Sequence, residues 1–241
     1  MITLNNLTCR YENTTIFENI SLNINKHLTI LGANGSGKST LAKALCSLVA
    51  YEGDIMLEGK NTKTISLNEK AKLISYIPAK LEVYDTDIVV SEFVLLGRFA
   101  YKKSFFDYSV NDKKIAQEML EFLNIVHLSE HIVSELSSGE QQLVLIAQAL
   151  TQQSEIIIFD EPTANLDPYN SKIIAQHIKK LQDKHTVILI THDLHLAAYI
   201  NTPVLFIKNK SAAYYEKDFF NDATLRQLYN VAFISLAVKY A

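Results

Sequence analysis

Cysteine and proline are scarce in this sequence. The two cysteines, Cys9 and Cys46, have neither the spacing of metal ligands nor the pattern of a disulfide scaffold, which fits a protein kept in a reducing cytoplasm. Only four prolines occur in 241 residues, and internal repeats and low-complexity segments are absent from the sequence. Because 48% of the residues are apolar, we expect a sizeable core within a single domain spanning residues 1–241.

Long apolar runs and an excess of one charge are also absent. The apolar stretches Ile156–Phe159 and Val187–Ile190 are far shorter than the roughly 20 residues that cross a bilayer, and the first residues lack the charged and then apolar pattern of a signal peptide. Any association with a membrane should therefore be peripheral. The net charge of −3 creates no strong field for nucleic acid, so we expect no nucleic-acid partner.

A complete phosphate-binding loop is present at Gly32–Thr40, which reads GANGSGKST. Its glycines allow backbone N–H groups to turn toward a common centre and surround phosphate oxygens. Lys38 can reach the β- and γ-phosphates of a nucleotide, and the hydroxyl of Ser39 is an oxygen ligand suited to Mg²⁺. We therefore predict nucleotide contacts from Asn34, Gly35, Ser36, Gly37, Lys38, Ser39 and Thr40.

The flanks of this loop support that interpretation. His27–Leu31 is a short run typical of a β-strand, and apolar residues recur at helical spacing after the loop, at Leu41, Ala44, Leu45 and Leu48. A strand before the loop and a helix after it would direct the positive end of the helix dipole at the phosphates. The alternative, a chance glycine-rich turn, does not account for both flanks.

Two adjacent carboxylates follow an apolar strand farther along the chain. Ile156–Phe159 leads into Asp160 and Glu161, so a buried strand would present both side chains at the carboxyl edge of a sheet, where ligands bind in α/β folds. We predict that Asp160 holds Mg²⁺ together with Ser39, and that Glu161 accepts a proton from the attacking water or orients it. The alternative is a solvated acidic turn.

A histidine follows a second predicted strand at the same edge. Val187–Ile190 is followed by Thr191 and His192, which would allow His192 to donate a hydrogen bond to the transferring phosphoryl group. The other histidines lack such a position, and we interpret them as surface or packed residues. Glu161 and His192 are therefore the predicted catalytic residues.

The segment Leu136–Gln142, with the sequence LSSGEQQ, precedes another apolar helical stretch. Ser137 or Ser138 can cap that helix, and the free N–H groups beside Gly139 would form a second anion site. Helix capping alone would also explain the segment, so the residues by themselves leave both interpretations open.

The order of the predicted elements indicates an α/β fold. Strands dominate the first third of the chain, and a mostly helical region follows, with a possible cap at Ser109. Asp167 can cap the helix that separates the strands Glu155–Phe159 and Thr186–Ile190. Because these two strands are apolar on both faces, they fit a parallel sheet covered by helices.

Together these segments resemble the ATP-binding-cassette (ABC) ATPases. GANGSGKST, LSSGEQQ, IIIFDEP, the Asn165–Asp167 turn and the ITHD segment occur in that family's order and cover nearly the whole chain. The resemblance implies a P-loop NTPase with a RecA-like parallel-sheet core, an N-terminal antiparallel β-subdomain and an inserted helical subdomain. Residues 1–84 and 153–241 would form the β-rich and RecA-like core, and residues 85–152 the helical subdomain.

The resemblance also implies ATP and Mg²⁺ as cofactors and a homodimer as the working unit. In the family, the signature segment of one subunit, here Leu136–Gln142, binds the γ-phosphate of ATP held by the other, which implies contacts from Ser137, Gly139 and Glu140. Asp167, in the separate turn Asn165–Asp167, is also expected to bind the nucleotide. Tyr11 matches the aromatic residue that stacks on adenine. A buried structural tyrosine is the alternative for Tyr11.

Within the family, Val89–Arg98 and Thr191–Ala198 resemble importers of iron siderophores, haem and vitamin B12. Generic helical packing would also explain both segments. We expect a peripheral subunit on the cytoplasmic face of the inner membrane, bound to integral permease subunits through its helical subdomain and, indirectly, to a substrate-binding protein. Because the given sequence ends at Ala241, we expect no long C-terminal regulatory domain of the kind found in sugar and methionine importers.

One expected residue is missing. The family places a Mg²⁺-binding glutamine after the strand that corresponds to Ile74–Ile77, but this chain has Ala79 there and no glutamine from Asn68 to Ala116. Because an alanine side chain cannot coordinate a metal, we expect weaker Mg²⁺ binding and weaker coupling, with hydrolysis retained. In the signature, Ser138 and Glu140 replace the usual glycine and glutamine.

Three other functions are alternatives to an importer ATPase. A non-hydrolysing regulatory module remains a candidate because of Ala79. A non-transport ABC ATPase is disfavoured by the length of the chain, since translation factors usually carry two cassettes and repair clamps a long coiled coil. A GTPase is disfavoured because Asn209–Ala212 lacks the aspartate that would recognise guanine.

Overall fold

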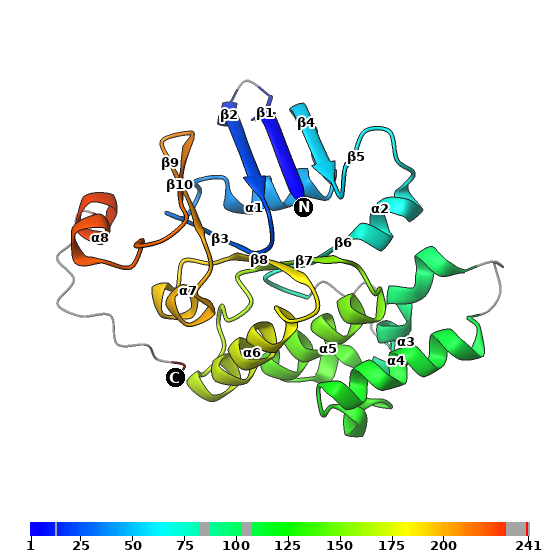
Figure 1. Ribbon diagram of the computed structural model, residues 1–241. Coiled ribbons are helices and arrows are strands. Elements are labelled where there is room, and N and C mark those ends of the chain that lie inside the picture. The colour runs from blue at the N-terminus through cyan, green and yellow to red at the C-terminus, as the bar shows by residue number, and fades with distance from the viewer. Residues whose placement is uncertain (13, 82–86, 103–107, 230–239, 241) are drawn as a thin grey trace.

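The computed structural model describes residues 1–12, 14–81, 87–102, 108–229 and 240. Its strands form two sheets, and helices lie on both sides of the larger one (Figure 1). The predicted α/β class, with an antiparallel layer beside a parallel core, is therefore confirmed.

The smaller sheet is antiparallel and has the strand order β2-β1-β4-β5. Its strands are β1 (Ile2–Tyr11), β2 (Thr14–Ile24), β4 (Glu52–Leu57) and β5 (Lys60–Asn61). Shifts in register along β1 and β2 keep these strands paired from Ile2 and Ile24 to Tyr11 and Thr14. The sequence pattern predicts strands only at Ile2–Cys9 and Ile20–Ile24, so both strands are longer than predicted.

The larger sheet has the strand order β10-β9-β3-β8-β7-β6. Its strands are β3 (Leu28–Gly32), β6 (Ile74–Ile77), β7 (Ile156–Asp160), β8 (Thr186–Ile190), β9 (Val204–Lys208) and β10 (Ser211–Tyr215). All neighbours are parallel except β9 and β10. Ile190 pairs with both Ile30 and Asp160, so the carboxyl ends of β3, β8 and β7 meet at one edge.

The helices of the described residues are short to medium in length. They are α1 (Lys38–Leu45), α2 (Leu67–Leu73), α3 (Val90–Leu95), α4 (Val110–Phe122), α5 (Ser138–Thr151), α6 (Pro168–Leu181), α7 (Leu194–Ile200) and α8 (Asp222–Tyr229), with 3₁₀ turns at Leu96–Tyr101, Val126–Leu128 and Val133–Glu135. Within the described ranges, none could cross a membrane as a long apolar helix. The inclusion of Leu48 in the helix after the loop is wrong, because α1 ends at Leu45 and Leu48 is 62% exposed.

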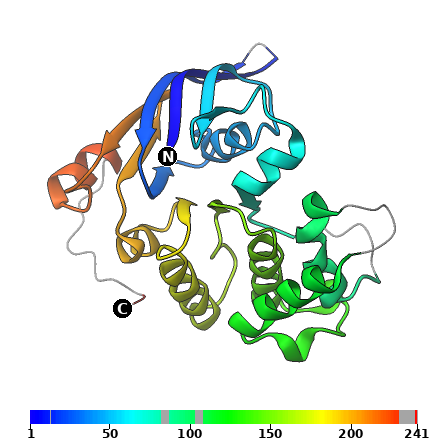
Figure 2. The same cartoon turned by 45° about the vertical axis from the view of Figure 1, so that its right-hand side comes forward.

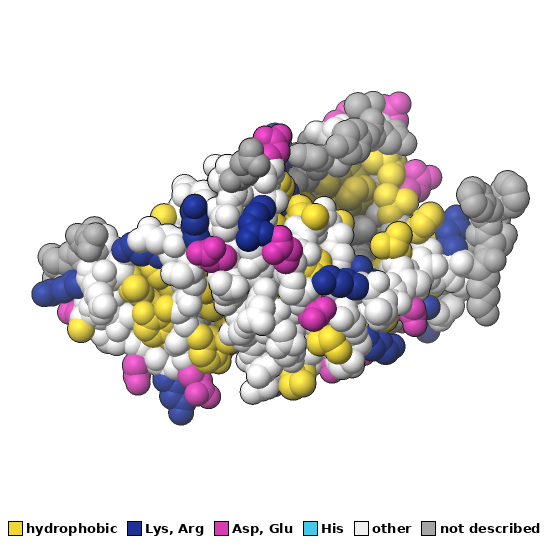
Figure 3. All heavy atoms as spheres, turned by 90° about the horizontal axis from the view of Figure 1, so that it is seen from above, with side chains coloured by type: hydrophobic (Ala, Val, Ile, Leu, Met, Phe, Trp, Pro, Cys, Tyr) yellow, Lys and Arg dark blue, Asp and Glu magenta, His cyan; other side chains and the backbone are white. Residues whose placement is uncertain are grey.

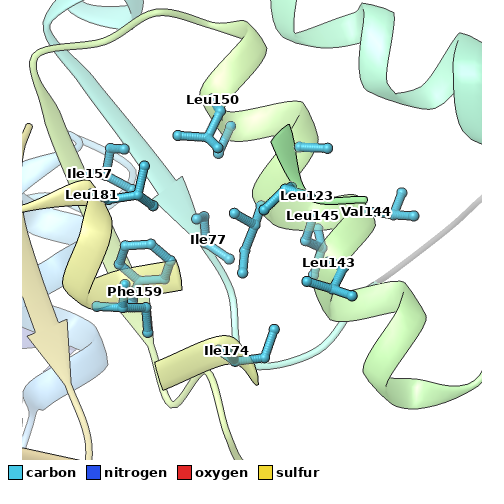
Figure 4. Close-up of a cluster of buried hydrophobic side chains, with 14 of the residues drawn as sticks. Ile77, Leu123, Leu143, Val144, Leu145, Leu150, Ile157, Phe159, Ile174 and Leu181 are labelled. Carbon is cyan, nitrogen blue, oxygen red and sulfur yellow. The ribbon is translucent and has the colours of Figure 1, made fainter. Parts of the chain in front are cut away.

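The parallel sheet separates two parts of the core because its strands are apolar on both faces. On one face of the sheet, Ile156 and Ile158 of β7 pack with α1 and the antiparallel sheet. On the other face, Ile157 and Phe159 pack with α5 and α6. Figure 4 shows the cluster on this second face. This alternation is what a strand covered on both sides requires. Packing on both faces fixes the position of β7, and therefore of the residues at its carboxyl end.

A group of helices lies to one side, below the N-terminal strands in Figure 2. α3, α4 and α5 pack against one another, and Ser109 caps α4 as predicted, through a hydrogen bond from the N–H of Asp112. Arg98 joins this group through a buried ion pair of 2.8 Å with Asp112 and a bond to the carbonyl of Thr151. The predicted boundary between residues 84 and 85 lies outside the described residues.

The surface seen from above carries both charges. Acidic and basic side chains lie intermixed along its middle (Figure 3). On the smaller sheet, Arg10 pairs with Glu52, and Lys63 lies 3.5 Å from Asp54.

Candidate functional site

The phosphate loop joins β3 to α1 and lies against β2. Gly37 is the N-cap of α1, has a left-handed φ of 98° and lacks a capping side chain. A Cβ at Gly37 would lie 2.6 Å from Cγ2 of Ile16 on β2, so both its conformation and its surroundings require glycine. The N–H groups of the first turn of α1 are consequently open to an anion.

Two side chains of the loop are arranged as a phosphate would require. The buried ammonium of Lys38 donates to the carbonyls of Gly32 and Ala33, at 3.0 and 3.2 Å. The hydroxyl of Ser36 is buried and has no hydrogen-bond partner among the described residues. A buried donor without a partner is unfavourable, and phosphate oxygens would satisfy it. The loop therefore fits a nucleotide phosphate.

Asp160 lies directly beside this loop. The hydroxyl of Ser39 donates to its Oδ1 at 3.1 Å, and the hydroxyl of Tyr76 donates to its Oδ2 at 2.7 Å. Asp160 itself is only 3% exposed. Ser39 and Asp160, both predicted Mg²⁺ ligands, are thus in contact, and a hydroxyl with a carboxylate is an oxygen-donor pair suited to that ion.

Glu161 and His192 are also in contact, at the ends of β7 and β8. Nδ1 of His192 lies 2.9 Å from Oε2 of Glu161, and the backbone N–H of His192 donates to the same oxygen at 3.2 Å. Oε1 of Glu161 lies 3.9 Å from the ammonium of Lys38. Glu161 has a left-handed φ of 50°, a conformation that is uncommon for non-glycine residues and that occurs often at functional sites.

The structure therefore brings five predicted residues together at one sheet edge. They are Lys38, Ser39, Asp160, Glu161 and His192. Within the loop, Asn34 and Gly35 are exposed and Thr40 is half-buried. Ala79 follows β6 as an exposed residue, and its methyl group offers no ligand.

The signature residues form a second group, at the N-termini of α5 and α6. Ser137 is the N-cap of α5 and forms a capping box with Glu140, whose carboxylate accepts from the hydroxyl of Ser137 at 2.5 Å and from its N–H at 2.9 Å. The hydrogen bonds from Ser137 lower the pKa of Glu140. Of the two candidate caps, Ser137 is thus the one that the structure uses.

The two helix ends are packed against each other. A Cβ on Gly139 would lie 2.6 Å from the side-chain amide carbon of Asn170, so glycine permits the close approach of α5 to α6. Asp167 caps α6 by accepting from the N–H groups of Tyr169 and Asn170, and bonds with Asn170 lower the pKa of Asp167. Two capped helix N-termini therefore lie side by side.

Tyr11 is the last residue of β1 and is 47% exposed. This exposure is against the alternative of a buried structural tyrosine. The phosphate loop contacts the same sheet, because Gly37 lies against Ile16 of β2. Since β2 pairs with β1, the exposed ring of Tyr11 and the residue that contacts the loop are on neighbouring strands.

The sequence profile of the ABC transporter family matches residues 17–164. The chain belongs to this family. It is an ATPase of the ABC type, and its fold agrees with the fold that its motifs predicted.

Relatives and solved structures agree with this assignment. The manganese transport system ATP-binding protein MntB of Halalkalibacterium halodurans is 32% identical over 89% of this chain and 85% of its own length. A probable iron chelatin transport ATP-binding protein of Helicobacter pylori is 33% identical over 87% of this chain and 84% of its own length. A metal-chelate type ABC transporter in an inward-facing conformation has a TM-score of 0.82 at 26% identity, over 96% of this chain and 89% of that chain.

A further similar structure was solved in a state that follows ATP hydrolysis. The cassette MJ0796, in a dimeric post-hydrolysis state bound to ADP and Pi, has a TM-score of 0.77 at 27% identity, over 91% of this chain and 100% of that chain. That structure is similar in fold to this ABC ATPase.

Two contacts near the site were not predicted from the sequence. One is the hydrogen bond from Tyr76 to Asp160, for which a tyrosine within the short strand β6 was the available signal. The other joins the buried Tyr240 to Asp193, which follows His192, at 2.6 Å. No local pattern connects residues so far apart in the sequence.

Proposed function

We propose that this chain is the ATP-hydrolysing subunit of an importer for a metal ion or a metal complex, such as an iron siderophore, haem or cobalamin. The contact between Glu161 and His192 beside the phosphate loop is the observation that carries the catalytic part. The cargo class is supported by relatives named for manganese, zinc and iron chelatin transport, although a relative named for phosphonate import is similarly close.

In the proposed site, the loop residues Asn34–Thr40 bind the phosphates of ATP, and Lys38 exchanges the carbonyls of Gly32 and Ala33 for phosphate oxygens. Ser39 and Asp160 would hold Mg²⁺, which offsets the negative charge of the phosphates. Glu161 orients the attacking water and accepts its proton, and His192 holds Glu161 and faces the γ-phosphate. Tyr11 stacks on the adenine ring.

The second group completes the site only in a homodimer. Ser137, Gly139 and Glu140 of one subunit would face the γ-phosphate of ATP bound by the other, and Asp167 would join the interface beside them. Two adjacent helix N-termini provide a positive potential for such an anion. ATP then favours the closed dimer because it contacts both subunits only in that state. The dimeric cassettes among the similar solved structures support this arrangement.

The proposed subunit lies on the cytoplasmic face of the inner membrane and binds the permease subunits through its helical part, residues 85–152. A substrate-binding protein would act on the other side of the membrane. The solved cbiO1 structure, described as part of the complex cbiONQ, supports assembly with other transporter subunits.

Phosphate release by the purified chain tests the catalytic proposal. Glu161→Gln should lower kcat by about 10²- to 10⁴-fold because it removes the general base. Glu155→Gln is the matched control, since Glu155 is an exposed carboxylate next to the opposite end of β7. An unchanged rate in Glu161→Gln would contradict the assignment.

Light scattering of Glu161→Gln with ATP tests the dimer, and a monomer at saturating ATP would count against it. Uptake by cells that express the chain with its permease tests the cargo. Manganese, zinc, an iron siderophore, haem and cobalamin should be compared, and uptake of none of them in an ATP-dependent manner would refute the cargo class.

A further inference from the structure

The two oxygens of the Asp160 carboxylate have different partners. Oδ1 accepts from Ser39 of the phosphate loop, whereas Oδ2 accepts from Tyr76 of β6. Because Asp160 is only 3% exposed, water has little access to its carboxylate and cannot readily replace either donor. The carboxylate is therefore held at both ends, by side chains from two different elements.

The strand pairing fixes where the Tyr76 hydroxyl lies. β6 and β7 are parallel neighbours, with Tyr76 paired to Ile158 and Ile77 to Phe159. The tyrosine thus lies beside the strand that carries Asp160, and a side chain as long as tyrosine reaches the carboxylate at the strand end. Because a carboxylate oxygen only accepts hydrogen bonds, the Tyr76 hydroxyl is the donor in this 2.7 Å contact.

We propose that Tyr76 is a positioning residue for the Mg²⁺ ligand Asp160: by holding Oδ2, it leaves Oδ1 on the side of Ser39 and the phosphate loop. The proposal rests on the assignment of Asp160 and Ser39 as ligands. Hydrogen bonds to a ligating carboxylate orient it toward the metal, and their loss typically costs about 10- to 100-fold in metal affinity.

The local sequence makes this contribution of β6 more important. Ala79, close after the end of β6, offers no ligand, so Tyr76 is the polar side chain by which this strand acts on the metal ligands. Without the hydroxyl, a buried carboxylate oxygen would lose its donor, and the carboxylate would be free to turn away from Ser39.

Mn²⁺ binding to the ADP complex, measured by electron paramagnetic resonance, provides a test that does not depend on hydrolysis. Tyr76→Phe keeps the ring and removes the donor, and we expect Mn²⁺ affinity to fall by about 10- to 100-fold, while binding of a fluorescent ADP analogue in EDTA stays unchanged. Tyr51→Phe is the matched control, because it removes another partly buried hydroxyl, bonded to Thr62 at 2.6 Å, and should leave Mn²⁺ affinity unaltered.

A second variant separates positioning from a packing role. Replacement of Tyr76 by 4-aminophenylalanine restores an N–H donor at the same place and should recover most of the Mn²⁺ affinity. Wild-type affinity in Tyr76→Phe, or a loss that the donor analogue does not repair, would overturn the proposal. Asp160→Asn tests the underlying assignment separately: if it binds Mn²⁺ as wild type does, the metal site itself has been misassigned.

Discussion

The ring nitrogen Nδ1 of His192 lies 2.9 Å from Oε2 of Glu161, which also accepts from the backbone N–H of His192. A carboxylate oxygen only accepts hydrogen bonds, so this contact places a hydrogen on Nδ1 and directs Nε2 away from Glu161. One side chain thereby sets the orientation of the other across the ends of two strands, and only 17% of the Glu161 side chain is exposed.

His192→Ala should lower kcat by about 100-fold or more, because Glu161 loses the partner that orients it. The KM for ATP should change little, since the phosphate contacts of the loop remain. Steady-state phosphate release measures both. His195→Ala, in α7 of the same segment, is the control, and equal kcat values for the two variants would contradict a role for His192.

Glu140→Gln should strengthen ATP-dependent dimerisation. The hydrogen bonds from Ser137 lower the pKa of Glu140, so its carboxylate is charged near pH 7, at the helix end that is proposed to meet a γ-phosphate. Glutamine keeps the capping interaction with Ser137 and removes the repulsion, worth about 1 kcal/mol or roughly fivefold in affinity for a solvated pair.

Sedimentation in the Glu161→Gln background measures this dimerisation without hydrolysis. Glu18→Gln removes the same charge from an exposed position of β2 and controls for net charge. Weaker dimerisation in Glu140→Gln than in this control would show that the carboxylate helps rather than opposes the contact.

Ala79→Gln should lower the Mg²⁺ concentration that gives half-maximal hydrolysis, because an amide oxygen would add a ligand where this chain has a methyl group. Lys80→Gln places the same side chain one residue farther along, at another exposed position, and should leave the Mg²⁺ dependence unchanged. Identical Mg²⁺ profiles for wild type and Ala79→Gln would refute the view that the alanine weakens metal binding.

The sequence predicted those parts of the site that depend on local pattern. Gly32–Thr40 has a fixed spacing. The apolar runs placed Asp160 at the end of β7 and His192 just after β8, and the bounds predicted for β8, Thr186–Ile190, are those observed. Parallel pairing then brings the strand ends together without further information. The contact of Ser39 with Asp160 could therefore be expected.

The contacts that were missed depend on register and on distant pairs. The bond from Tyr76 to Asp160 requires the alignment of β6 on β7, which Ile74–Ile77 alone does not specify. The extra length of β1 and β2 comes from irregular pairing that interrupts the alternation of apolar and polar residues. Leu48 continued a helical spacing beyond the last turn of α1, since spacing alone does not mark where a helix ends.

Asp112→Asn should lower the free energy of unfolding by about 3 kcal/mol at pH 7, because it leaves the buried Arg98 without its counter-ion. Burial acts to raise the pKa of Asp112, but the bonds from Ser109 and Arg98 outweigh it and lower the pKa. The folded value is thus below the unfolded value of about 3.9, so this stabilisation is present above about pH 4 and is lost as the pH falls through the folded pKa.

Urea unfolding at pH 7 and at pH 3 to 4 measures this difference. Glu118→Gln breaks an exposed ion pair with Lys114 on the same helix and should change stability little. A difference between Asp112→Asn and wild type that stays constant down to pH 3 would show that the carboxylate charge is not its source.

Tyr240→Phe should destabilise the region that carries His192. The hydroxyl of Tyr240 donates to Oδ2 of Asp193, while Oδ1 of Asp193 caps α7 by accepting from the N–H groups of His195 and Leu196. Burial, with Asp193, raises the pKa of Tyr240, so the donor persists across the working pH range. Its loss should cost about 1–3 kcal/mol, with a shift in melting temperature of about 2–4 °C per kcal/mol. Tyr169→Phe, at an exposed position of α6, is the control, and equal melting temperatures for the two variants would show that the contact with Asp193 does not stabilise the fold.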